Sequence, residues 1–175
     1  MGKSTQKLTI LAMFIALDFV LSPIFRVEGM APMSSVINVL AGIVMGPWYA
    51  GVMALMTGIL RMTLLGIPPL ALTGAVFGAV LAGWFYKLGQ RPIWSALGEL
   101  LGTGIIGSLL SYPVMVWFTG SSNSLYWFIY TPRFVGAAIM GGLVALLVNL
   151  ALQRISQYQR LSQLFSPRKE VIKHG

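Results

Sequence analysis

The chain is poor in charge and has no cysteine. Of its 175 residues only 9% are charged, while 57% are hydrophobic. A soluble domain carries about 25% charged residues, so this chain has too little polar surface to cover a water-soluble globule. The lack of cysteine excludes a disulfide framework and a thiolate metal site. The composition therefore predicts an integral membrane protein.

Catalytic and metal-binding patterns are also missing from the sequence. The one histidine, His174, lies in the polar C-terminal stretch, which excludes a Ser–His–Asp triad within the apolar part. We find no Gly-x-x-x-x-Gly-Lys-Ser/Thr phosphate loop and no cluster of His, Asp and Glu at metal-ligand spacing. The sequence therefore predicts a protein that is not an enzyme and holds no cofactor or metal. Binding or transport of a small molecule remains as the predicted class of function.

Six apolar segments are long enough, or nearly so, to be membrane helices. The first follows Lys3 and Lys7 as a signal peptide would, but it has no convincing cleavage site and Asp18 interrupts it, which favours a retained helix. The second is short for a full crossing, and we expect neighbouring helices to shield it. Pro132 is expected to set the true start of the last helix. The segments are about 8–24, 34–45, 48–65, 70–86, 93–118 and 126–152.

The basic residues favour one orientation. An even number of crossings places both termini, and nine of the twelve basic residues, on the same side, leaving only Arg26, Arg61 and Arg133 toward the other. The positive-inside rule makes the richer side cytoplasmic. This distribution also argues against nucleic acid as the reason for the net charge of +8. We predict an all-α bundle of six transmembrane helices over residues 1–152, followed by a cytoplasmic basic tail, 153–175, that contains an amphipathic helix.

Charged side chains within the apolar segments are the first candidates for a site, because charge in a membrane is costly. Each of them also has a plain structural explanation, as a buried pair or as an end residue reaching for water. The predicted topology places Asp18, Arg61 and Arg133 toward the outer face. Asn38, a polar amide in an apolar helix, and several aromatic residues lie in the same outer half of the membrane. The aromatic residues form either an interface belt or a pocket. We expect the polar stretch 26–33 to cover this site from outside. The candidates are Asp18, Asn38, Arg61, Glu99, Arg133, Tyr112, Trp117 and Tyr130.

Small residues recur at helical spacing in most segments. Rows of this kind let helix backbones approach closely in lipid. Internal packing is the ordinary explanation for all of them, and only the row Ala12/Ala16 is singled out below. The others include Gly74/Gly78/Ala82, Gly98/Gly102 and Ala137/Gly141/Ala145.

Several stretches together give the chain a family resemblance. It resembles the substrate-binding S component of energy-coupling factor (ECF) vitamin transporters, and within that group the ThiW subfamily, associated with hydroxyethylthiazole, the thiazole half of thiamine. Two departures concern the ligand: Met62 stands where the family tends to have asparagine, and Leu72-Thr73-Gly74 where it tends to have Pro-Gly. The stretches that carry the resemblance are Ala31-Pro32-Met33, Asn38-Val39-Leu40-Ala41-Gly42, Gly46-Pro47-Trp48-Tyr49-Ala50, Arg61, Gly98-Glu99-Leu100-Leu101-Gly102-Thr103-Gly104-Ile105-Ile106-Gly107 and Ser111-Tyr112-Pro113.

The resemblance implies partners and a ligand. The partners are a transmembrane T component, on which the row Ala12/Ala16 docks, and two cytoplasmic ATPases, in the plasma membrane of a bacterium or archaeon. Gly2 argues against the cobalt and nickel members, which carry histidine there. The alternatives are an S component for another vitamin or heterocycle, a structural subunit without a ligand, and a small membrane enzyme. The residues that the resemblance and the chemistry assign to substrate are Asn38, Arg61, Tyr112, Trp117, Tyr130, Arg133 and Glu99.

Overall fold

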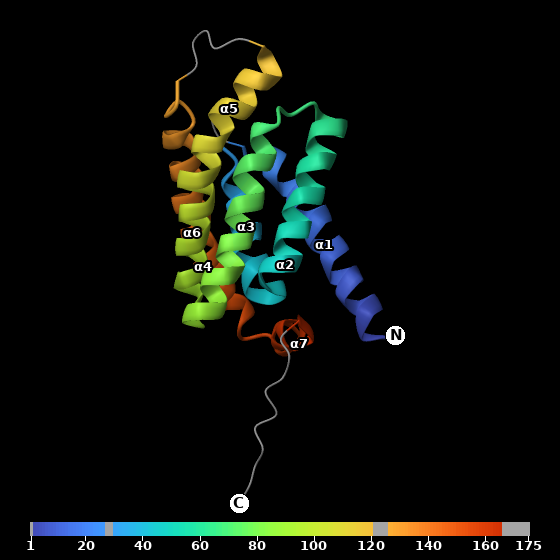
Figure 1. Ribbon diagram of the computed structural model, residues 1–175. Coiled ribbons are helices and arrows are strands. Elements are labelled where there is room, and N and C mark those ends of the chain that lie inside the picture. Colours follow the sequence, from blue (N-terminus) through green and yellow to red (C-terminus); the bar gives the residue numbers. More distant parts are fainter. Residues whose placement is uncertain (1, 27–29, 121–125, 166–175) are drawn as a thin grey trace, which may run out of the picture.

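The structure is a computed structural model that describes residues 2–26, 30–120 and 126–165. Those residues fold into a bundle of helices, which Figure 1 shows from the side. One segment, η1, has the wider π-helical winding and joins α4 to α5 without a break. The elements are α1 (Lys3–Ile24), α2 (Pro32–Leu65), α3 (Leu70–Gly89), α4 (Pro92–Glu99), η1 (Leu100–Gly107), α5 (Ser108–Thr119), α6 (Thr131–Leu152) and α7 (Ser156–Phe165).

Five helices in the described part are long and apolar enough to cross a membrane, which confirms an all-α, multi-pass membrane protein. They are α1, α2, α3, the continuous helix Pro92–Thr119 and α6. Their outer faces carry large exposed apolar side chains, such as Leu17 on α1 and Leu147 on α6. In a membrane these faces meet lipid tails, so their exposure carries no penalty.

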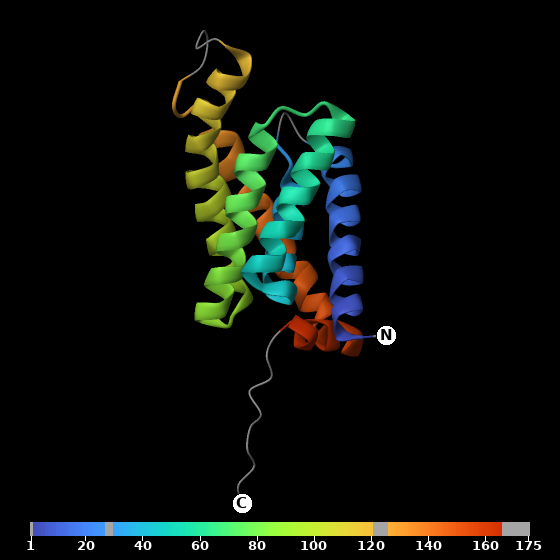
Figure 2. The same ribbon diagram turned by 45° about the vertical axis from the view of Figure 1, so that its right-hand side comes forward.

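Helix α2 turns back on itself at Gly46. A straight helix would separate Ser34 from Arg61 by about 40 Å, yet Nη1 of Arg61 lies 3.3 Å from Oγ of Ser34, 27 residues away in sequence. Gly46 has φ +75° and ψ 179°, a conformation open only to glycine. Pro47 follows, in the first turn, where its missing N–H costs nothing. The arms 32–45 and 47–65 thus lie antiparallel, as Figure 2 shows.

The first arm of α2 is the centre of the bundle. Every residue from 34 to 45 is buried. An arm of 14 residues rises only about 21 Å, less than the roughly 30 Å of hydrocarbon in a bilayer. Because neighbouring helices surround it, its ends do not face lipid, which is the shielding expected from the sequence.

The small-residue rows inside the bundle are contact surfaces between helices. On the facing sides of α3 and η1, a Cβ added to Gly107 would lie 2.7 Å from Cα of Gly74. On α6, a Cβ added to Gly141 would collide with the backbone at Pro32. In contrast, Ala12 and Ala16 lie on the exposed side of α1. Internal packing thus explains the rows on α3, η1 and α6, but not the row on α1.

Helix α7 closes the end of the bundle where α1 begins. Its Phe165 ring lies 5.0 Å from that of Tyr49, edge to face, and Nζ of Lys7 lies over both rings. The hydroxyl of Tyr158 donates to Oδ1 of Asn149 at 2.9 Å. Burial, and secondarily Tyr86, raises the pKa of Tyr158 above its ordinary value, so the phenol remains a donor. The first and last helices therefore start and end at the same end of the bundle (Figure 1).

One detail of the last helix confirms the sequence, and one of η1 was not foreseen. Helix α6 begins at Thr131, with Pro132 in its first turn, as expected from the proline. The π-helical winding of η1 has no signature in the apolar pattern. The predicted outer loop and tail are only partly covered, because 27–29 and 166–175, which include Arg168, Lys169, Lys173 and His174, lie outside the described residues.

Candidate functional site

A cavity of about 160 Å³ lies within the bundle, at the end opposite α7. Its walls come from the C-terminal end of α1, the first arm of α2, Arg61 on the second arm, the start of α3, the α4–η1 junction and the start of α6. Position along these helices defines its depth. Arg26, Ile67 and Tyr130 lie at the helix ends and form the mouth, while Asn38 and Glu99 lie deepest.

The floor of the cavity is a buried hydrogen-bonded group. Nδ2 of Asn38 donates to Oε1 of Glu99 at 3.2 Å and to the carbonyl of Ala75 at 3.3 Å. The hydroxyl of Thr103 lies 2.8 Å from the same Oε1 and 3.0 Å from the carbonyl oxygen of Gly74, so its one proton is shared between these two acceptors. The carboxyl group of Glu99 thus joins the central arm of α2 to η1.

Local structure explains how a carboxyl group fits here. Glu99 is the last residue of α4 and Thr103 lies one turn on, in η1, so both side chains point to the same side. They occupy the space opposite Gly78, where an added Cβ would overlap both Oε2 of Glu99 and Oγ1 of Thr103. π-helical segments inside helices occur frequently at functional sites. This one carries Thr103 and begins directly after Glu99.

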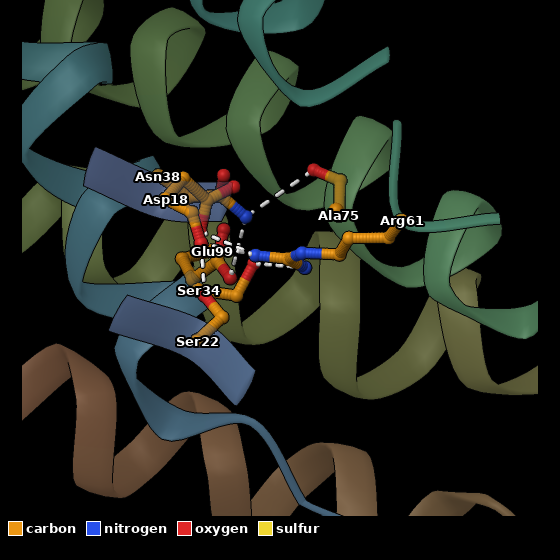
Figure 3. A network of polar contacts seen from close by, with 7 residues as sticks. All are labelled: Asp18, Ser22, Ser34, Asn38, Arg61, Ala75 and Glu99. Atoms are coloured by element: carbon orange, nitrogen blue, oxygen red, sulfur yellow. Dashed lines mark hydrogen bonds and ion pairs between the residues drawn. The ribbon is translucent and has the colours of Figure 1, made fainter. Parts of the chain in front are cut away.

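Arg61, which lines one wall of the cavity, forms an ion pair between α2 and α1. Nη2 of Arg61 lies 2.7 Å from Oδ1 of Asp18 and 2.8 Å from the carbonyl oxygen of the same residue. Ser22 donates to Oδ1 of Asp18 at 2.7 Å, and Nη1 of Arg61 donates to Ser34. Figure 3 shows Arg61 reaching across Ser34 toward Asp18, with the Asn38–Glu99 group beside it. Both charges are buried, so each needs the other.

The mouth is basic and aromatic. Arg26 and Arg133 line it with exposed side chains. The rings of Tyr130 and Phe134 meet edge to face with centroids 6.4 Å apart, and Met30 completes this side. A flat apolar ligand would find a stacking surface here and polar groups deeper in.

Several polar atoms around the cavity have no hydrogen-bond partner among the described residues. Such atoms are rare in folded proteins, and each calls for an explanation such as a bound ligand or water. Those at the floor and the ion-pair wall are Oε2 of Glu99, Oδ1 of Asn38, Nε of Arg61 and Oδ2 of Asp18. The described residues hold no group of three or more His, Cys, Asp and Glu side chains placed to bind a metal.

A family model describes almost all of the chain. Residues 8–155 match the family of the thiamine-precursor transporter protein ThiW. The chain belongs to the ThiW family. It is therefore a transporter protein of a family that handles thiamine precursors, as the sequence resemblance predicted. No curated protein and no solved structure is significantly similar to it.

The cavity gathers most, but not all, of the residues proposed from sequence for this ThiW protein. Two aromatic residues are not among the described residues that line it. Tyr112 packs on Trp127 with ring centroids 4.6 Å apart, and Trp117 is 85% exposed on α5. The five that line the cavity are Asn38, Arg61, Glu99, Tyr130 and Arg133.

Sequence reasoning missed the small hydroxyl residues of the site. Ser22 follows Asp18, and Thr103 follows Glu99, each by four residues, the spacing that places two side chains on one helix face. This signal was available for both in the ThiW sequence. Ser34 had no such signal, because its partner Arg61 reaches it only through the reversal at Gly46.

Proposed function

We propose that this chain is the substrate-binding S component of an ECF transporter and that its ligand is hydroxyethylthiazole. It takes the ligand into the cavity from outside and delivers it inward with a T component and two ATPases. In this proposal the membrane is the plasma membrane of a bacterium or archaeon. The two arms of α2 count as separate crossings, six in all, and both termini are cytoplasmic.

The observation that carries this proposal is the cavity. An apolar cavity of about 150 Å³ takes up benzene, so about 160 Å³ matches a single aromatic ring with little room beyond it. It has an aromatic edge, Tyr130 and Phe134, and a few convergent polar groups, including Asn38 and Arg61. A small heterocycle with one short polar arm would match this lining, because its ring can stack on the aromatic edge and its arm can bond the polar groups.

The charges around the cavity favour a neutral ligand over the cation thiamine. Arg26 and Arg133 line the mouth, and Asp18 is already paired with Arg61, which leaves Glu99 at the floor as the one acid in the described lining that could face a cation. Thiamine also adds a second ring to a cavity sized for one. We therefore expect free hydroxyethylthiazole to bind at least tenfold more tightly than thiamine, a difference of about 1.4 kcal/mol.

Isothermal titration calorimetry on the purified full-length protein tests this directly. None of the cavity-lining residues that the structure describes is a tryptophan, so heat is a safer signal than fluorescence. The ligands are hydroxyethylthiazole, thiamine and the pyrimidine half of thiamine. Tighter binding of thiamine or of the pyrimidine would overturn the thiazole assignment, and no binding of any of them would favour a structural subunit.

A further inference from the structure

The cavity changes character from its mouth to its floor. The mouth has exposed cationic side chains, Arg26 and Arg133. The floor consists of Asn38, which is 1% exposed, and Glu99, which is 0% exposed, with Thr103 beside them. A ligand with two unlike ends would therefore meet different chemistry according to which end enters first.

The hydrogen bonds of the floor leave two oxygens without partners. Oε1 of Glu99 lies within hydrogen-bond distance of Nδ2 of Asn38 and of the hydroxyl of Thr103, while Oε2 has no hydrogen-bond partner, although the buried Ser35 also faces this carboxyl group. Asn38 uses its amide N–H groups on Glu99 and the carbonyl of Ala75, so Oδ1 has none. These two oxygens belong to the deepest polar side chains lining the cavity.

A hydroxyl group is the ligand group that fits such a pair. It donates one hydrogen bond, which Oδ1 of Asn38 can accept, and its oxygen accepts one from Oε2 of Glu99 when that carboxyl group is protonated. An ionised Glu99 only accepts, so the match requires the protonated carboxyl group. A phosphate monoester has charged acceptor oxygens that Oδ1 of Asn38 cannot bond, and its charge would be buried without a cation. A methyl group would leave both oxygens without a partner.

The floor is also closed behind these groups. The carboxyl group of Glu99 and the hydroxyl of Thr103 already fill the space beside Gly78. Ala75 and Ala137 line the deep part and are themselves buried. The floor is therefore packed at this point, and a hydroxyl oxygen needs less space there than a phosphate group.

We propose that Asn38 and Glu99 form a hydroxyl-specific subsite, so that the ligand binds arm first with its ring against Tyr130 and Phe134. The transporter then accepts the free alcohol and rejects both its phosphate ester and the analogue without the hydroxyl. Thr103 acts as a positioning residue that holds Oε1 of Glu99 and keeps Oε2 available. This inference rests on the proposed function, since it takes hydroxyethylthiazole as the ligand.

The test compares three ligands on the purified full-length protein by calorimetry: hydroxyethylthiazole, the 5-ethyl analogue and the phosphate ester. We expect the ethyl analogue to bind at least tenfold more weakly, because a site built to bond a hydroxyl rejects ligands that lack it. The phosphate ester should bind at least a hundredfold more weakly. Equal affinity of alcohol and ethyl analogue would overturn the subsite while leaving the proposed function intact, whereas no binding of either would overturn the proposed function itself.

Variants assign the discrimination to residues. Asn38→Ala should weaken binding of the alcohol about tenfold and change binding of the ethyl analogue less than twofold. Glu99→Gln should keep the preference for the alcohol, because its amide N–H can donate to the hydroxyl oxygen as the protonated carboxyl group does. Asn149→Ala is the matched control, since Asn149 is an equally buried asparagine under α7, away from the cavity. Equal losses for both ligands in Asn38→Ala, or loss of the preference in Glu99→Gln, would overturn the proposal.

Discussion

Arg61 joins three helical segments at a single side chain. It lies on the second arm of α2, reaches Ser34 on the first arm and binds both the side chain and the backbone of Asp18 on α1. The sequence predicted that both charges lie in the outer half of the membrane, and a buried pair was one open explanation. It did not predict their pairing, which depends on the reversal at Gly46 and on how α1 packs.

Removing the arginine should destabilise the protein far more than removing both charges. Arg61→Ala leaves Asp18 buried and unpaired, which typically costs about 3–5 kcal/mol. We expect the double variant Asp18→Asn, Arg61→Gln to recover part of that loss, because no buried charge remains. Thermal unfolding in detergent measures both, with Arg133→Ala at the exposed mouth as the control that should change little. A double variant less stable than Arg61→Ala would contradict a coupled pair.

At the scale of elements, the reversal in α2 could be predicted and the π-helical segment could not. Gly46-Pro47 is a local turn signal and divides two apolar runs, as the structure bears out. The winding of η1 has no local signal. Its glycines pack against the backbone of α3, for instance Gly102 against Phe77, and such contacts between distant segments cannot be read from periodicity.

Gly46 and Gly66 provide a matched pair for testing the reversal. Both have positive φ, +75° and +63°, and an added Cβ meets nothing closer than 3.5 Å at either. Gly66 has the left-handed helical conformation, where alanine costs about 1–2 kcal/mol. Gly46 is in a region essentially restricted to glycine, so Gly46→Ala should lower the melting temperature more than Gly66→Ala. Equal melting temperatures would show that the turn tolerates another conformation.

Exposure of Ala12 and Ala16 on α1 permits a test of docking on the T component. Ala12→Leu or Ala16→Leu should abolish uptake in cells while leaving ligand binding near wild type, because a bulky side chain blocks close approach of helices. Ala137→Leu, in the buried row of α6, is the contrasting variant and should destabilise the protein itself. Loss of ligand binding in the α1 variants as severe as the loss of uptake would contradict a docking role.

At the scale of the whole molecule, the fold class was easier to predict from the sequence than the residues that line the cavity. The apolar runs predicted an all-helical membrane protein, and the rows of small residues predicted close helix packing without indicating which helices pair. Aromatic residues were less informative, because Tyr112 and Tyr130 look alike in sequence. Only packing shows that one stacks on Trp127 while the other lines the cavity. The direction in which a side chain points from its helix shows what it contacts only once the neighbouring helices are placed.

The orientation of the molecule in the membrane gives the last prediction. The first helix begins, and α7 ends, at one end of the bundle, while the cavity opens at the other. Uptake from outside requires that the cavity face the exterior, and the positive-inside rule predicts that the α7 end, the side expected to hold nine of the twelve basic residues, faces the cytoplasm. The chain contains no cysteine, so labelling of a single introduced cysteine reports on which side of the membrane that one position lies. Tyr126→Cys, exposed at the cavity end, should react with an impermeant maleimide in intact cells, and Gln157→Cys on α7 only after lysis. The reverse pattern would place the cavity mouth in the cytoplasm, and capture of a ligand from outside would then be untenable.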